Sequence, residues 1–205
     1  MSRFTGPRLK VMRALGVDLP GLSRKTKESR PNPPGQHGAR AVRRRKSDFG
    51  VQLIEKQKLR YNYGLTERQL RRLMADARKS KEPTGDVLLQ LLERRLDNVV
   101  FRAGFAPTIA AARQLVTHGH LQLNGRTASI PSMRLRAGDE VSMKPGRAEL
   151  VVVVESLKEP ALTRPEWLTW DEQQKRARIA HLPAVDDVPF PVDVQQVVEY
   201  YAKRL

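Results

Sequence analysis

The chain has 205 residues, a formal net charge of +16 and an isoelectric point near 10.8, so a polyanion is the first partner to consider. It has no cysteine, which excludes disulfides, thiolate zinc sites and cysteine nucleophiles. No apolar run approaches the roughly 18 residues of a membrane span, and no signal-peptide core opens the chain, so a cytoplasmic location is expected.

Residues 1–48 are predicted to form a basic, extended N-terminal segment with little core of its own. They carry 13 Lys and Arg against 3 Asp and Glu, and five prolines and five glycines break any long helix. A short helix is predicted over residues 8–15, ended by Gly16. The run Pro33–Gly38 is typical of a turn and a loop whose backbone can approach phosphate. The cations at 43–46 are rarely ordered without an anionic partner, although a solvated arm or a localisation signal is the other interpretation.

Two helices are predicted between Asp48 and Arg78. Asp48 is expected to cap the first, with Lys56, Lys58 and Arg60 facing outward, and residues 61–64 end it. Thr66 and Gln69 have the spacing of a capping box for the second helix, over residues 67–78. Its buried stripe is predicted to be Leu70, Leu73, Met74 and Ala77.

The next stretch predicts two helices followed by a hairpin. Apolar residues 88, 92, 96, 99 and 100 recur at the spacing of one helical face, and Gly104 suits a C-cap. Thr108 is expected to cap the following helix, which Gly119 ends. The inner face of that helix is predicted to be Ile109, Ala112, Leu115 and Val116. After Gly119 the apolar residues alternate with polar ones, which predicts a strand, and Asn124-Gly125 is a strong signal for a hairpin turn.

Beyond the hairpin, a strand carrying Val141 and Met143 and a second, β-branched strand over residues 150–154 are predicted. A helix is expected over 171–180, after Trp167 and Trp170, and a closing helix over 194–204. The predicted fold class is therefore α+β: a helical domain with an inserted module of two helices on a small bent antiparallel sheet, whose polar and basic surface is expected to bind RNA phosphate.

The predicted domains are the N-terminal segment 1–48, a mainly helical domain made of 49–93 with 158–205, and the RNA-binding module 94–157. Residues 158–205 carry 7 Lys and Arg against 8 Asp and Glu. This near-neutral part either faces protein or completes a core.

Tests for catalytic and metal chemistry are negative. His118 and His120 flank a glycine, but no third ligand lies at a characteristic metal spacing, so contact with phosphate or helix capping is expected instead. Neither glycine-rich nucleotide loop nor a nucleophile elbow is present. The sequence predicts no cofactor, no metal and no catalytic residue.

One enzyme interpretation rests on Asp97. Residues 95–97 (Arg-Leu-Asp) are similar to the element that carries the catalytic aspartate of one group of RNA pseudouridine synthases. Those enzymes need a much larger mixed sheet around it, whereas here the triplet lies in a helical pattern. We therefore expect Asp97 to anchor a helix or hairpin, paired with an arginine, and the protein not to be an enzyme.

Several motifs resemble the RNA-binding module named after the fourth protein of the small ribosomal subunit. They are RLDNVVFR (95–102), ARQLV (112–116), HGH (118–120) and NGR (124–126). The module also occurs in tRNA synthetases, pseudouridine synthases and a heat-shock RNA-binding protein, so alone it implies only structured RNA. The remaining motifs resemble the bacterial family of that ribosomal protein over nearly the whole chain: RPNPPGQHG (30–38), EKQKLR (55–60), YGLTERQ (63–69) and PVD (191–193).

The resemblance implies a structural constituent of the small subunit, and a primary binder of 16S rRNA that nucleates assembly of the subunit body. It also implies contact with the fifth small-subunit protein, an influence on translational accuracy, and a place near the point where mRNA enters. Certain bacterial members carry an N-terminal four-cysteine zinc site. Here Leu9 and Met12 stand in that region, so we expect a zinc-less form whose N-terminal segment is ordered by RNA or neighbouring proteins.

The expected RNA-binding surface is polar and basic. Its cations release counterions, and the shape of two helices and a hairpin selects a folded RNA junction. The predicted RNA-binding residues are Arg3, Arg8, Lys10, Arg13, Gln36, His37, Arg40, Arg43, Arg44, Arg45, Lys46, Lys56, Lys58, Arg60, Arg68, Arg71, Arg72, Arg95, Arg113, Gln114, His118, His120, Asn124 and Arg126. The second hypothesis is a free-standing RNA chaperone or regulator with the same module, which would not require the N-terminal extension or the near-neutral C-terminal part.

Overall fold

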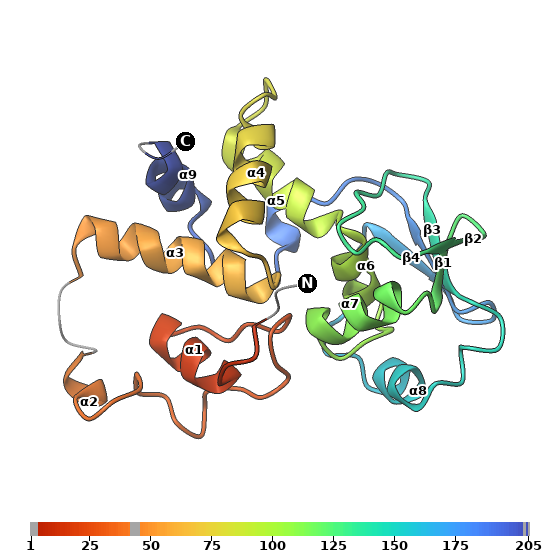
Figure 1. The fold of residues 1–205 in the computed structure, drawn as a ribbon, viewed down its shortest axis with the longest axis horizontal. Helices are drawn as coiled ribbons and strands as arrows, with labels where there is room; N and C mark the ends of the chain where they lie inside the picture. The colour runs from red at the N-terminus through yellow and green to blue at the C-terminus, as the bar shows by residue number, and fades with distance from the viewer. Residues whose placement is uncertain (1–3, 42–45, 203, 205) are drawn as a thin grey trace. The chain divides into compact units, whose positions relative to one another are not determined.

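The computed structural model describes residues 4–41, 46–202 and 204. Its chain divides into two compact units, here called the helical unit (Met1–Leu88 and Pro189–Leu205) and the sheet unit (Leu89–Val188). Helices and one antiparallel sheet make up the regular structure (Figure 1), which confirms the predicted α+β class. None of the described helices has the length and apolarity that a membrane crossing requires.

The helical unit is organised around its longest helix. In this unit α3 lies between α1 and α9, and α9 also packs against α4 (Figure 1). The chain passes into the sheet unit within α5. The helices are α1 (Arg8–Leu15), α2 (Gly38–Ala41), α3 (Asp48–Asn62), α4 (Glu67–Ala77), α5 (Thr84–Glu93) and α9 (Val194–Ala202).

Capping and apolar spacing define α4 as the sequence predicts. The Thr66 side chain accepts a hydrogen bond from the Gln69 backbone N–H, and the Gln69 side chain bonds back to the Thr66 backbone N–H, which satisfies two free donors of the first turn. The predicted stripe, residues 70, 73, 74 and 77, is buried. The prediction for α3 was less accurate, because Ser47 rather than Asp48 is its N-cap.

The N-terminal segment has more core than expected. Met12 and Leu19 are fully buried, and the Leu19 N–H donates to the Met12 Sδ at 3.3 Å. The Gly21 N–H donates to Asn62 Oδ1 at 2.9 Å, tying this segment to α3. Contacts within the chain itself therefore help to hold this segment, beside any contribution from RNA or neighbouring proteins, which stays a prediction.

The sheet unit contains a five-stranded antiparallel sheet in the order β2-β1-β3-β5-β4. Helices α6 and α7 pack against each other, and α7 has the predicted Thr108 cap and buried face. The β1–β2 turn places Asn124 at φ 50° and Gly125 at φ 75°, as a two-residue hairpin requires. The elements are α6 (Leu96–Arg102), α7 (Ile109–Thr117), β1 (Leu121–Leu123), β2 (Arg126–Ala128), β3 (Glu140–Met143), α8 (Val151–Lys158), β4 (Leu168–Asp171), β5 (Arg176–Ile179) and the short 3₁₀ helix η1 (Val185–Asp187).

The predicted apolar face over residues 88–100 belongs to two helices instead of one. Helix α5 ends at Glu93, and Arg95 adopts an extended conformation in a β-bridge with Arg134. The Leu135 N–H donates to the Arg94 carbonyl, and the Leu96 N–H donates to the Met133 carbonyl, both at 2.9 Å. These bonds to a distant segment replace helical ones, so the break depends on tertiary contacts that leucine spacing does not reveal.

Residues 150–154 are not the predicted strand. Val153 and Ser156 are buried in α8, whereas Val151 and Val152 are exposed, which is a helical rather than an alternating pattern. Five consecutive apolar residues carry no periodicity, and Glu155 to Lys158 continue them as ordinary helix formers. The β-branched composition was therefore the wrong guide.

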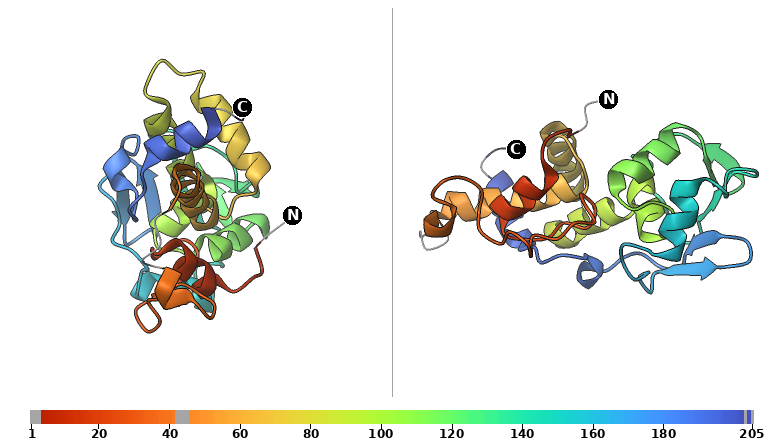
Figure 2. Two further views of the ribbon diagram at one scale, coloured as in Figure 1. Left: turned by 90° about the vertical axis from the view of Figure 1, so that its left-hand side faces the viewer. Right: turned by 90° about the horizontal axis from the view of Figure 1, so that it is seen from below.

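The predicted helix over residues 171–180 is also wrong. These residues form the β4–β5 hairpin, in which Ala177 and Ile179 are buried while Arg176 and Arg178 are exposed. Figure 2 shows this hairpin in blue. Strand β4 is an edge strand of the sheet. Residues 158–188, which the sequence analysis assigns to the helical domain, lie in the sheet unit, where they extend the expected small sheet.

Candidate nucleic-acid interface

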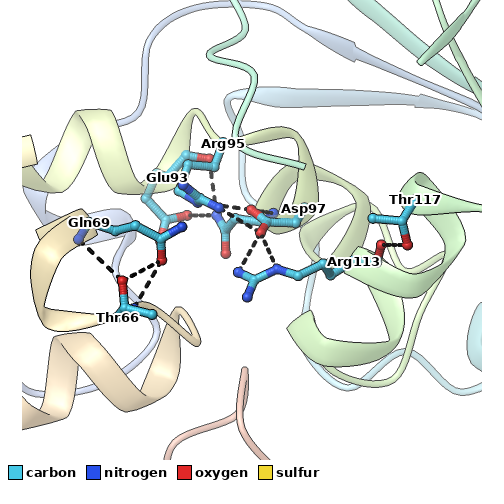
Figure 3. Close-up of polar contacts among 8 residues, drawn as sticks. Thr66, Gln69, Glu93, Arg95, Asp97, Arg113 and Thr117 are labelled. Atoms are coloured by element: carbon cyan, nitrogen blue, oxygen red, sulfur yellow. Dashed lines mark hydrogen bonds and ion pairs between the residues drawn. The ribbon is translucent and has the colours of Figure 1, made fainter. Parts of the chain in front are cut away.

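A buried carboxylate organises the start of the predicted RNA-binding module (Figure 3). Asp97 is fully buried, and its Oδ2 accepts hydrogen bonds from Arg95 Nη2 at 2.8 Å and Arg113 Nη2 at 2.6 Å. The Nε atoms of the same arginines donate to the Asp97 carboxylate at 3.0 Å each. This confirms the predicted pairing of Asp97 with an arginine, and shows two predicted RNA-binding arginines directed at a buried carboxylate.

A second buried polar cluster adjoins it in the chain. Asn98 Nδ2 donates to the Glu93 backbone carbonyl at 3.0 Å and to Glu93 Oε2 at 2.9 Å. Arg102 lies 3.5 Å from the same carboxylate and donates to the Asp187 carbonyl at 2.6 Å. Buried charges need partners of this kind. The role of Glu93 in this buried cluster could not be predicted from the sequence, because its position in an apolar helix gives no signal that its carboxylate is buried.

The exposed side of the sheet unit carries the remaining predicted residues. Gln114, His118 and Arg126 are exposed and His120 is half-buried, with the two histidine rings 5.9 Å apart. Asn124 has a structural role as well, since its side chain donates to Asp139 Oδ1 and accepts from the Glu140 N–H, both at 2.9 Å. That pair of bonds fixes the hairpin turn against the start of β3.

The environment of His120 is strongly basic. Burial, followed by the positive charges of Arg147, His118 and Lys144, lowers the pKa of the His120 imidazole. Lys144 and Arg147 are exposed, and the Lys144 N–H donates to the His120 carbonyl at 2.9 Å. These two cations are not among the predicted RNA-binding residues, although their place in the turn after β3 could have indicated them.

In the helical unit, several predicted residues are engaged within the protein. Lys56 is buried and bonds Glu67 at 2.9 Å, so the prediction that it faces outward is wrong. Lys58 Nζ lies 2.7 Å from Glu55 Oε1, and Arg13 Nε donates to the Asn32 carbonyl at 2.8 Å. These three cations hold the fold of the unit together.

The other predicted residues of this unit divide into three groups. Arg60 is partly exposed. Those that are exposed are Arg8, Lys10, Gln36, His37, Arg40, Lys46, Arg68, Arg71 and Arg72. Those outside the described residues are Arg3, Arg43, Arg44 and Arg45.

The composition of the helical unit is much more basic than that of the sheet unit. It contains 24 of the 38 Lys and Arg residues but only 10 of the 22 Asp and Glu residues. A polyanion is therefore attracted mainly to this unit. Over the part of the chain that the structure describes, no three His, Asp or Glu side chains are grouped so as to hold a metal ion.

Comparison with known proteins gives matches over the whole chain. Residues 3–93 match the family model of the ribosomal protein S4/S9 N-terminal domain, and residues 94–141 match that of the S4 domain. The chain is 75% identical to the small ribosomal subunit protein uS4 of Methylobacillus flagellatus and 71% identical to uS4B of Nitrosomonas europaea, covering 100% of both chains in each case. It is 45% identical to uS4c of Cyanophora paradoxa, over 99% of this chain and 100% of that protein.

Proposed function

Because the chain belongs to the S4 family of small-subunit ribosomal proteins, we propose that it is a primary binder of small-subunit rRNA that nucleates assembly of the subunit body. It is a structural constituent of the small ribosomal subunit, not an enzyme, and works in the cytoplasm as part of the ribosome. The observation that carries the proposal is the 75% identity over the full length of a relative that is named for that subunit.

The distribution of charge and of buried ion pairs supports two different roles among the predicted RNA-binding residues: contact with RNA, and positioning of the helices. Exposed cations such as Arg8, Lys10 and Arg68 contact phosphate and supply salt-dependent affinity. Arg95 and Arg113, engaged with Asp97, position α6 and α7, so that the exposed side chains His118 and Arg126 meet RNA in a fixed arrangement. Shape then selects a folded junction.

The finer expectations from the family complete the proposal. The protein contacts the fifth small-subunit protein, influences translational accuracy through that contact, and lies near the point where mRNA enters the subunit. A free-standing RNA chaperone or regulator is the alternative. The full-length likeness to ribosomal proteins favours the ribosomal role, since a chaperone needs the RNA-binding module but not the rest of the chain.

The test is binding to naked RNA in the absence of other ribosomal proteins. A fragment covering the 5′ part of small-subunit rRNA is titrated with the purified protein, against excess unrelated structured RNA, over a series of salt concentrations. The proposal predicts binding that survives the competitor at moderate salt. Equal loss of affinity for both RNAs as salt rises would leave only non-specific attraction and favour the chaperone.

A further inference from the structure

The helical unit contains an open pocket of about 560 Å³, which brings three of the predicted RNA-binding residues together with the C-terminal end of the chain. Three helices and the chain after α9 line it: α3 contributes Lys56 and Arg60, α4 contributes Glu67 and Arg71, and the C-terminal end contributes Tyr200, Tyr201 and Arg204. Among the described residues, four cations and one carboxylate thus surround a single concavity. The pocket lies within one compact unit, so its geometry does not depend on how the two units are placed.

Glu67, the one carboxylate among the described lining residues, is already engaged. Glu67 accepts hydrogen bonds from the Tyr201 hydroxyl at 2.6 Å and from Lys56 Nζ at 2.9 Å. Burial raises the pKa of Glu67, but the two hydrogen bonds and the charges of Lys56 and Arg60 outweigh it, and the net effect is a lowered pKa. Glu67 is therefore ionised at neutral pH and matched by Lys56. The three arginines supply an excess of positive charge.

The bonds of those arginines go to carbonyl oxygens and aromatic rings. Arg71 Nη2 donates to the Arg204 carbonyl at 2.7 Å, and Arg204 Nη1 donates to the Tyr200 carbonyl at 2.9 Å. The Arg60 guanidinium lies 4.8 Å from the centre of the Tyr61 ring. These contacts fix the positions of the guanidinium groups without neutralising their charge. Each guanidinium has five N–H donors, so donors remain for a ligand.

The Tyr200 ring holds two cations near each other. Lys56 Nζ lies 4.9 Å and the Arg204 guanidinium 4.3 Å from its centre. A ring face attracts cations through its quadrupole, which partly offsets the repulsion between them. A cluster of like charges held in this way is pre-organised for an anion, because little further ordering is needed when the anion binds.

We propose that this pocket binds one phosphate group of the RNA backbone, with Arg71 and Arg60 as its main ligands. Guanidinium groups match phosphate oxygens bidentately, and the excess charge of the pocket favours a strong anion. The inference rests on the proposed function for the source of the phosphate. It adds a built site, closed on one side by the C-terminal helix, to what is otherwise a general basic surface.

The first test compares two arginines of α4. Arg71→Gln removes a pocket ligand, whereas Arg78→Gln removes the same charge from the exposed C-cap of this helix, outside the pocket. We expect Arg71→Gln to weaken rRNA binding about five- to tenfold at physiological salt and to reduce the slope of log affinity against log salt by about one, with a much smaller effect of Arg78→Gln. Equal effects of the two variants would overturn the proposal.

Two further variants separate ligand binding from folding. Arg71 also bonds the Arg204 carbonyl, so Arg71→Gln could loosen α9. Arg71→Lys keeps the charge and should restore the salt slope while losing the bidentate geometry. Arg60→Gln, which removes a contact to a ring and not to α9, should repeat the effect of Arg71→Gln. Normal affinity of Arg60→Gln, with loss only in variants whose thermal unfolding midpoint falls, would assign Arg71 a structural role alone.

A second measurement identifies the ligand. The full-length protein is titrated with inorganic phosphate, uridine 5′-monophosphate, the rRNA fragment and a glutamate-rich peptide, while the Tyr200 ring signals are followed by NMR. Saturable shifts with phosphate and with the RNA, both lost in Arg71→Gln, are expected. Shifts with the small phosphates alone would exclude an RNA source, and shifts with the peptide alone would assign the pocket to a protein partner. Failure of the wild-type protein to prefer rRNA over a competitor would contradict the proposed function separately.

Discussion

Asp97 illustrates how a residue that resembles a catalytic group can be structural. Its carboxylate accepts hydrogen bonds from two arginines and from the Asn98 backbone N–H, and it is fully buried. A carboxylate without exposure to solvent is not accessible to a substrate. The sequence predicted the arginine pairing correctly, but it could not show that Arg113 faces inward. That depends on the packing of α7 against α6, which links residues 16 positions apart.

Arg113→Ala tests this residue directly. It leaves Asp97 buried with one of its two cationic partners, so we expect the free energy of unfolding to fall by about 2 kcal/mol. Arg126→Ala, at an exposed position of β2, should change it by less than about 0.5 kcal/mol. Urea denaturation of both variants gives the comparison. Affinity for rRNA at near-physiological salt should also fall for Arg113→Ala, and unchanged stability and affinity would contradict the role assigned to this ion pair.

Gly38 lies so close to the backbone of Pro33 that any side chain at this position would collide with it. A Cβ atom there would lie 2.0 Å from the Pro33 carbonyl oxygen, so the loop before α2 can adopt this path only with glycine. Gly38→Ala should displace the loop and increase the rate at which a protease cleaves between residues 31 and 41. Ala39→Ser, at the exposed neighbouring position, serves as the control. Equal cleavage rates would show that the close approach has no structural consequence.

At the scale of elements, prediction succeeded where local signals were explicit. The capping box at Thr66, the Thr108 cap and the Asn124-Gly125 turn each define an element boundary through hydrogen bonds or backbone angles that nearby residues determine. It failed for residues 150–154, where five consecutive apolar residues carry no periodicity, and for residues 171–180, whose conformation depends on distant partners. Strand β5, for example, is paired with β3, more than 30 residues earlier in the chain.

Two variants in α8 test whether this segment is a helix and not a strand. Val153 is fully buried and Val151 is 68% exposed, although both are β-branched residues of one apolar run. Val153→Ala removes two buried methyl groups and should lower the free energy of unfolding by about 2 kcal/mol, whereas Val151→Ala should have almost no effect. Thermal or urea unfolding distinguishes them. Comparable losses would indicate a strand buried on both faces.

Glu67 connects α4 with α3 through Lys56 and with α9 through Tyr201. Because the pKa of Glu67 is lower in the folded protein than its ordinary value, its contribution to stability is present above that ordinary value and is lost as pH falls through the folded pKa. We therefore expect wild-type stability to fall more steeply below about pH 5 than that of Glu67→Gln.

The control for this pH dependence is Glu82→Gln, which removes an exposed carboxylate of the helical unit. Its stability should follow the wild-type curve as pH is lowered, in urea unfolding measured at half-unit steps. A Glu67→Gln curve parallel to wild type over the whole range would mean that the hydrogen bonds to Lys56 and Tyr201 do not favour the ionised carboxylate.

At the scale of the whole molecule, composition was the most reliable guide. The net charge of +16 indicated a polyanion, and the helical unit holds most of the Lys and Arg residues. Composition could not distinguish exposed cations from buried cations that stabilise the fold. Lys56, Arg95 and Arg102 are buried, whereas Arg68 and Arg126 are exposed, and nothing in the charge pattern of the sequence separates the two sets.

We propose that this protein, without any other ribosomal protein, recognises one folded site in small-subunit rRNA. Hydroxyl-radical footprinting of full-length small-subunit rRNA with the purified protein, in moderate salt and with excess unrelated RNA, tests this proposal. We expect protection confined to one compact junction in the 5′ part of the RNA, saturating over a single range of protein concentration. Protection scattered over many helices, or removed by the competitor, would show a basic surface without shape recognition and overturn the proposal.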